Sequence, residues 1–181
     1  LLGYFVGEMV QEKVPVIDGI QNTPNIGRLK HHGAAMASSG GVEMYHIVGF
    51  TPEAHSVDMA FGNNKPLDTF KFGAAERKIA YENLNSAKDP NVDFIMLGCP
   101  HYTLEELWEA AKMLYGKRVH ENINLWIFTP RALKEVADKQ GLTDIITKAG
   151  ASLMTDTCPC ISKVFPKGTK IAATDSAKHA H

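Results

Sequence analysis

Residues 92–116 read VDFIMLGCPHYTLEELWEAAKMLYG, and this stretch decides the fold class. Val92–Leu97 is a largely apolar run of strand length, which is typical of a strand buried in a parallel sheet. Thr103 followed by Glu106 forms a capping box, and apolar residues at helical spacing follow it as far as Gly116. The stretch therefore predicts a strand, a short loop and an amphipathic helix that covers the sheet.

The same alternation of strand and helix patterns continues in both directions along the chain. Thr23-Pro24 and Thr129-Pro130 each predict a helix start, with Thr as N-cap and Pro at the first helical position. The other predicted strands are Pro15–Ile20, Val42–Phe50, Asn124–Phe128, Ser152–Thr155 and Lys170–Thr174, with Thr69–Phe72 as a weaker candidate. We therefore predict an α/β fold, with a mainly parallel sheet flanked by helices, in a single domain over residues 1–181.

The composition is that of an ordinary globular protein. The 181 residues are 44% hydrophobic and 22% charged, and the formal net charge is -1. This charge gives no support for a nucleic-acid partner, and no apolar run approaches the roughly 18 residues of a membrane helix. We therefore expect a cytoplasmic protein that binds small molecules. The chain begins at Leu1 rather than at Met, which we interpret as a piece of a longer protein.

The cysteines suggest metal chemistry. Cys99, Cys158 and Cys160 make an odd number, which argues against a disulfide framework and for reduced thiols. Cys99 lies just before a predicted helix N-terminus, where the helix dipole favours the thiolate that a metal requires. Pro follows both Cys99 and Cys158, and such local rigidity suits a sulfur that points at an iron–sulfur cluster. On spacing alone, cysteines that pack as small hydrophobic residues are an equal alternative.

Three loops contain the unusual residues of the chain. Gly98–His101, Thr155–Cys160 and Thr174–Lys178 each follow a predicted strand. In a parallel sheet the carboxyl ends of the strands meet at one edge, and ligands bind there. We therefore expect these loops to lie close together although they are far apart in the sequence.

Three further features are candidates for binding or catalysis. His101 could neutralise a carboxylate or act as an acid, and the alternative is a structural histidine. The loop Ser38–Gly41 could place backbone N–H groups around an anion, or it could be an ordinary connection. Lys178, at a predicted helix start, could bind an anionic group or be a solvated lysine. We interpret the pair His31 and His32 as part of a helix surface.

Taken together, these residues resemble a known family. The matching stretches are Val14–Gly19, Ser38–Ala54, Gly98–His101, Thr155–Cys158 and Thr174–Lys178. In this order they resemble the motifs of the aconitase X large subunit, and the similarity covers nearly the whole chain. Five motifs in the same order are far more specific than any one of them.

The resemblance implies a hydro-lyase of the aconitase superfamily that acts on mevalonate 5-phosphate or cis-3-hydroxy-L-proline. It also implies an iron–sulfur cluster, with Cys99 and Cys158 as two of its ligands and a further cysteine upstream of Leu1. The implied partner is a small swivelling domain, either a separate small subunit or fused. Cys160 and His179 depart from the family pattern, so neither inherits a role.

The resemblance also implies a set of site residues. The substrate-binding residues are Ser38, Ser39, Gly40 and Lys178. His101 and Lys178 would neutralise the carboxylate or phosphate of the substrate. The base is left open; a serine base as in aconitases could be Ser39 or Ser176, and its hydroxyl would need strong activation.

Two other classes of protein remain as alternatives. One is a non-catalytic metabolite- or metal-binding α/β module, in which the cysteines pack and the small-residue loops bind an anion. The other is an enzyme with Cys99 as nucleophile beside His101, although residues two apart on an extended loop lack the third group that orients such a pair.

Overall fold

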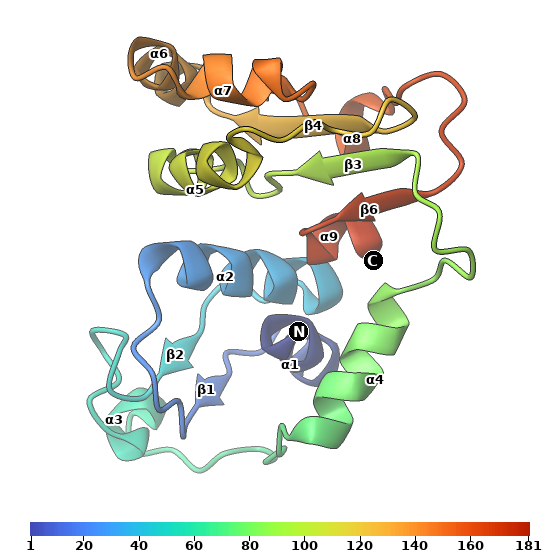
Figure 1. Cartoon of the computed structure of the whole chain (residues 1–181). Coiled ribbons are helices and arrows are strands. Elements are labelled where there is room, and N and C mark those ends of the chain that lie inside the picture. Colours follow the sequence, from blue (N-terminus) through green and yellow to red (C-terminus); the bar gives the residue numbers. More distant parts are fainter. The chain divides into compact units, whose positions relative to one another are not determined.

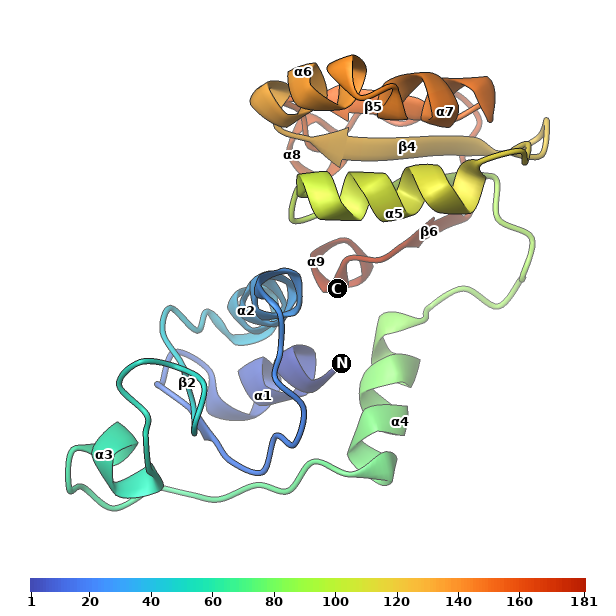
Figure 2. The ribbon, with the colours of Figure 1, turned by 60° about the vertical axis from the view of Figure 1, so that its left-hand side comes forward.

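The computed structural model describes residues 1–159 and 161–181, and the chain forms two compact units (Figures 1 and 2). The first unit is Leu1–Ser86 with Ala180–His181, and the second is Ala87–His179. The chain passes from the first unit to the second within residues 85–91, an exposed polar stretch that reads NSAKDPN. Such a segment makes few contacts, which is typical of a boundary between compact units. Among the described residues, no helix has the length and apolar character that a bilayer-spanning segment needs.

The second unit contains a four-stranded parallel sheet. Its strands are β3 (Phe94–Leu97), β4 (Asn124–Thr129), β5 (Ser152–Thr155) and β6 (Ala172–Thr174), in the order β5-β4-β3-β6. Every neighbouring pair is parallel, so all four carboxyl ends lie at the same edge. The predicted fold class, a parallel sheet flanked by helices, is confirmed.

Helices cover one face of this sheet (Figure 2). They are α5 (Leu104–Leu114), α6 (Arg131–Lys139) and α7 (Leu142–Lys148). Leu107 and Ala111 of α5 pack with Leu125 and Ile127 of β4 and with Ile146 of α7 in one buried cluster. The predicted capping box begins α5, since the Thr103 hydroxyl accepts from the Glu106 N–H at 3.2 Å and the Glu106 carboxylate accepts from the Thr103 N–H at 2.7 Å.

The other face of the sheet has its own aromatic core. Phe94, Met96 and Phe128 are buried there, with Trp126 packed against them. Successive residues of β4 alternate between this cluster and the one under the helices, because side chains in a strand point to opposite faces in turn. Burial on both faces explains why Leu125–Phe128 of β4 is apolar at every position. The short helices α8 (Pro159–Ser162) and α9 (Ala177–Ala180) follow β5 and β6.

The first unit is mainly helical. It contains α1 (Leu2–Val10), α2 (Ile26–Gly40), α3 (Val57–Phe61) and α4 (Ala74–Leu84), with two short strands, β1 (Val16–Ile17) and β2 (His46–Ile47). The two strands are parallel, and Ile17, Met36, Val42 and Ile47 form the buried core. The segment Thr69–Phe72, the weaker strand candidate, forms no strand; it is largely exposed and has no neighbouring strand to complete its backbone hydrogen bonds.

Glycines allow α1 and α2 to pack backbone against backbone. A Cβ atom on Gly40 would collide with the carbonyl oxygen of Gly7, and one on Gly3 would collide with the carbonyl oxygen of His32. A Cβ atom on Gly7 would collide with the Ser39 hydroxyl. These positions therefore accept only glycine if the two helices are to keep their present distance.

Two local predictions for α2 are wrong. The helix begins after Asn25, whose side chain accepts from the Arg28 N–H at 2.8 Å, and not after Thr23. His32 is not a surface residue, because its ring packs edge-on against Tyr45, with centroids 5.2 Å apart. Burial lowers the pKa of His32 to about 4, so the ring is neutral near pH 7.

We expect Gly40→Ala to lower the free energy of unfolding, measured by urea denaturation, by about 1–3 kcal/mol or more, as overpacking a close contact does. Gly33→Ala in the same helix is the matched control. A Cβ atom there would lie 3.4 Å from Tyr45 Cε1, an ordinary contact. Alanine also has the higher helix propensity, so Gly33→Ala should be neutral or stabilising. Equal effects of the two substitutions would show that the Gly7–Gly40 contact does not limit the packing.

Candidate functional site

The loop after β3 turns through Gly98. This glycine is buried, with φ 97°, and a Cβ atom on it would collide with the carbonyl oxygen of Phe128. Both the positive φ and the close approach require glycine. The turn places Cys99 at the carboxyl edge of the sheet, directly followed by Pro100 in a cis peptide.

Backbone contacts hold the rest of this loop against the end of β4. The Tyr102 N–H donates to the Phe128 carbonyl at 2.8 Å, and the Thr129 hydroxyl donates to the Tyr102 carbonyl at 2.9 Å. Thr129 is fully buried and is the last residue of β4. The prediction that Thr129 caps the next helix is therefore wrong, and Pro130 precedes α6 in its place.

The carboxylate of Asp175, in the loop after β6, joins this loop to the one after β3. Its Oδ1 accepts from the Gly98 N–H at 3.2 Å, and its Oδ2 accepts from the Tyr102 hydroxyl at 2.8 Å. Burial, and secondly the nearby carboxylate, raise the pKa of Tyr102, so this hydroxyl stays protonated and acts as a donor.

Further contacts tie down the loop after β5. His101 Nε2 lies 3.1 Å from the carbonyl oxygen of Thr157, so the tautomer with a proton on Nε2 donates to it. The Arg131 guanidinium pairs with the Asp156 carboxylate at 2.6 Å. Asp156 has φ 51°, a conformation that short polar residues tolerate in turns. The loops after β3, β4 and β5 are thus linked to one another.

Cys99 and Cys158 are free, half-buried thiols on two of these linked loops. Cys158 Sγ lies 4.0 Å from His179 Nε2, and burial lowers the pKa of His179, which favours its neutral form. In residues 1–159 and 161–181, no group of three or more His, Cys, Asp or Glu side chains is placed to hold a metal ion. The donor set fits two thiolate ligands of an iron–sulfur cluster, and further ligands would have to come from elsewhere. The side chain of Cys160 lies outside the described residues.

Ser176 and Lys178 differ in burial. Ser176 is 3% exposed, and its hydroxyl accepts from the His179 N–H at 3.3 Å, as an N-cap of α9 does. The N–H of Ser176 donates to the Thr174 hydroxyl at 3.1 Å. Lys178, on the first turn of α9, is exposed.

The predicted small-residue loop, Ser38–Gly41, is the end of α2 and its C-cap, Gly41. Ser38 Oγ donates to the Ala34 carbonyl at 2.8 Å, and Ser39 Oγ contacts the carbonyl oxygens of Tyr4 and Ala35 at 2.9 and 3.0 Å. A helix C-terminus presents carbonyl groups rather than N–H groups. The prediction that this segment surrounds an anion with backbone N–H groups is therefore wrong.

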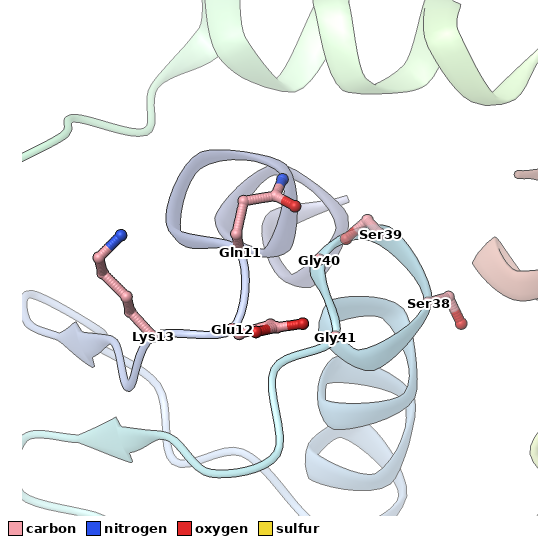
Figure 3. Close-up of a pocket in the computed structure, with 7 residues that line it drawn as sticks. All are labelled: Gln11, Glu12, Lys13, Ser38, Ser39, Gly40 and Gly41. Carbon is pink, nitrogen blue, oxygen red and sulfur yellow. The ribbon is translucent and has the colours of Figure 1, made fainter.

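A pocket nevertheless lies at this end of α2 (Figure 3). Its volume is about 540 Å³, and its lining residues are Gln11, Glu12, Lys13, Ser38, Ser39, Gly40 and Gly41. The lining contains one cationic and one anionic side chain, and the two serine hydroxyls (Figure 3). It can therefore offer both donors and acceptors to a small polar ligand.

The geometry agrees with comparisons to known proteins. Residues 1–82 match the aconitase X second domain, and residues 92–181 match the aconitase X third domain. The chain belongs to the aconitase X family. It is 36% identical to the cis-3-hydroxy-L-proline dehydratase of Pseudomonas aeruginosa over 99% of this chain and 32% of that protein. It is 37% identical to the phosphomevalonate dehydratase large subunit of Methanocaldococcus jannaschii over 99% of this chain and 43% of that protein.

A solved structure supports the same assignment. The crystal structure of Thermococcus kodakaraensis aconitase X in its holo-form matches with a TM-score of 0.82 and 31% identity. The match covers 99% of this chain and 44% of that chain. The aconitase X chain described here thus spans less than half the length of these relatives.

Four side chains that hold the sheet-edge loops of this aconitase X chain were not among the predicted site residues. They are Tyr102, Arg131, Asp156 and Asp175. Asp156 and Asp175 lie inside loops that the sequence had already singled out, so the convergence of loops at one sheet edge was a usable signal for them. Which donor each carboxylate would bind depends on strand order, which local patterns do not show.

The buried Thr129 hydroxyl provides a test of how firmly these loops are held. Thr129→Val keeps the shape but leaves the Tyr102 carbonyl without this donor, so we expect unfolding free energy to fall by about 1–3 kcal/mol. Thr147→Val is the control, because Thr147 is exposed and its hydroxyl bonds within its own helix. Urea denaturation should show a change within about 0.5 kcal/mol for the control. A Thr129→Val protein as stable as the parent would show that this contact is dispensable.

Proposed function

We propose that this chain is part of the catalytic large subunit of an iron–sulfur-dependent hydro-lyase. Its substrate is a small hydroxy acid, either mevalonate 5-phosphate or cis-3-hydroxy-L-proline. The observation that supports the proposal best is the pair of free, half-buried thiols, Cys99 and Cys158, on linked loops at one sheet edge. The names of the two relatives above, both dehydratases, support the reaction class.

Cys99 and Cys158 would hold the cluster as two of its thiolate ligands, and the longer protein would supply the rest. When bound, an iron of such a cluster supplies Lewis-acid chemistry, which polarises a hydroxyl or carboxylate oxygen of the substrate. Elimination of water also requires removal of a carbon-bound proton and neutralisation of the anionic substrate. The residues of this chain would perform these two tasks.

Lys178 and His101 are the proposed partners of the substrate's carboxylate or phosphate. Lys178 is exposed at the carboxyl edge of the sheet, and its ammonium group is free to reach an anion there. His101 lies on the loop after β3 at the same edge, where its Nε2 contacts the Thr157 carbonyl of the loop that contains Cys158. The proposed contacts to substrate oxygens from the hydroxyls of Ser38 and Ser39 are supported by their place in the lining of one pocket, which Gly40 also lines.

The base is proposed to be Ser39 or Ser176. Ser176 Oγ already accepts a hydrogen bond from a backbone N–H. Such a contact stabilises the alkoxide, which is the form of serine that would act as the base. Ser39 Oγ contacts two carbonyl oxygens, which stabilise its protonated form, but it lines the pocket. Ser176→Ala and Ser39→Ala would distinguish them, because removal of the base lowers kcat by orders of magnitude with a small change in KM.

The proposed partner is a small subunit or a fused swivelling domain, and the proposed compartment is the cytoplasm. Relatives named phosphomevalonate dehydratase large subunit, such as that of Methanocaldococcus jannaschii, support a small-subunit partner.

We expect Cys99→Ser and Cys158→Ser in the full-length protein, purified without oxygen together with its small subunit, to lose the visible absorption of the cluster. A serine oxygen is a poor substitute for a thiolate at such a site. Cys160→Ser is the control and should keep iron and acid-labile sulfide near the parent content. Equal loss in all three variants would mean that Cys160 is also a ligand, and no iron in the parent would refute the proposed function.

Lys178→Met should lower kcat/KM about tenfold to a hundredfold, because a charge-assisted contact contributes roughly 1.5–3 kcal/mol. Methionine keeps much of the stem, so the enzyme should stay folded. The control is Lys163→Met at another exposed lysine, for which we expect turnover of both candidate substrates to be unchanged. Full activity of the Lys178→Met enzyme would show that Lys178 is a solvated surface lysine with no part in substrate binding.

A further inference from the structure

We propose that Asp175 is a positioning residue that fixes the direction of the Cys99 thiol. The inference rests on the proposed function, because it assumes that Cys99 is a metal ligand. It starts from one carboxylate, whose two oxygens accept from Gly98 and from Tyr102. These two donors flank the segment Cys99–His101, so Asp175 holds both ends of the segment that contains the thiol.

The Gly98 contact satisfies a buried backbone donor. Gly98 is buried, and its close approach to Phe128 leaves no room for the turn to move toward β4. A buried N–H without an acceptor is costly, so the turn is stable in the orientation that points this N–H at Asp175 Oδ1. That orientation determines where the next residue, Cys99, leaves the sheet.

The Tyr102 contact fixes the far end of the segment. The backbone of Tyr102 is held on both sides, by the Phe128 carbonyl and by the Thr129 hydroxyl. Its half-buried phenol then donates to Asp175 Oδ2 at 2.8 Å. The segment Cys99–His101 is therefore fixed at both ends, by Gly98 and by Tyr102. Within it, His101 contacts the loop that contains Cys158.

Because Asp175 acts through its hydrogen bonds in this proposal, a neutral substitute that keeps both bonds should preserve its effect. In Asp175→Asn the amide oxygen can still accept from the Gly98 N–H, and the amide NH₂ can donate to the phenol oxygen of Tyr102. Asp175→Ala removes both contacts, and Tyr102→Phe removes one. Asp138→Ala is the matched control, because Asp138 is a carboxylate that bonds to Lys134 on α6.

The test uses the full-length subunit with its small subunit and has two readouts. The first is the rate at which a thiol reagent modifies Cys99 in iron-free protein, resolved from Cys158 by mass spectrometry. The second is iron content after reconstitution, with the visible absorption of the cluster. Thermal unfolding of each variant identifies those that fail to fold.

We expect Asp175→Ala to raise the modification rate of Cys99 about tenfold, because loss of both hydrogen bonds releases the loop, and to lower iron content. Asp175→Asn and Asp138→Ala should stay within about twofold of the parent, and Tyr102→Phe should lie between them. Parent-like behaviour of Asp175→Ala would overturn the proposal, and so would an Asp175→Asn protein as impaired as Asp175→Ala. If Asp175→Ala does not fold, a Tyr102→Phe protein with parent-like Cys99 reactivity and iron content refutes the proposal.

The two readouts separate this inference from the proposed function. A parent protein that takes up no iron refutes the proposed function, while the modification rates of Cys99 still test whether Asp175 positions the Cys99 thiol. If the parent binds iron and the Asp175→Ala variant binds as much, the positioning role of Asp175 is refuted and the proposed function stays in place.

Discussion

The backbone contact between Gly98 and Phe128 is the constraint on which the sheet-edge site depends. β3 and β4 pair in parallel up to Leu97 and Ile127, and the chain then turns at Gly98 so tightly that no Cβ atom fits. Because the turn comes directly after the strand, Cys99 lies at the edge of the rigid sheet and not on a long loop. A side chain held this close to a sheet has few conformations to lose on binding, which favours a preorganised site.

Polar contacts between the loops hold the rest of the sheet edge in place. Asp175, His101 and the Arg131–Asp156 pair each join two loops that are distant in the sequence. The Arg131–Asp156 pair is exposed, and exposed ion pairs typically contribute only about 0–1 kcal/mol to stability, so it is better explained by the geometry that it imposes. These contacts form a chain of links across the carboxyl edge, in which a shift of one loop would strain its neighbour. The two thiols lie on this chain of links, and that connects the fold to the proposed chemistry.

Local sequence patterns predicted what depends on neighbouring residues and failed where a distant residue decides. Apolar runs and the Thr103 capping box were sufficient for β5 and α5, whose bounds match the prediction closely. Thr129 was predicted as a cap from its place before Pro130, but its hydroxyl donates to the Tyr102 carbonyl, which lies 27 residues away in the chain. The segment Ser38–Gly41 was predicted as a loop from its composition. Its first three residues continue α2, where the serine hydroxyls bond to carbonyls of the helix itself and Gly40 permits contact with α1. Gly41 ends the helix in the left-handed conformation.

Both units place a candidate residue beside a glycine that the packing requires. Cys99 follows Gly98, which is pressed against Phe128, and Ser39 precedes Gly40, which is pressed against Gly7. A glycine contact brings two backbones closer than any side chain allows, and it leaves the adjacent residue with little freedom to move. The same feature makes the fold least tolerant of substitution next to the residues proposed for chemistry. Stability and function are therefore coupled at these two positions, and a loss of activity on changing either glycine has to be separated from a loss of folding before it is assigned to the site.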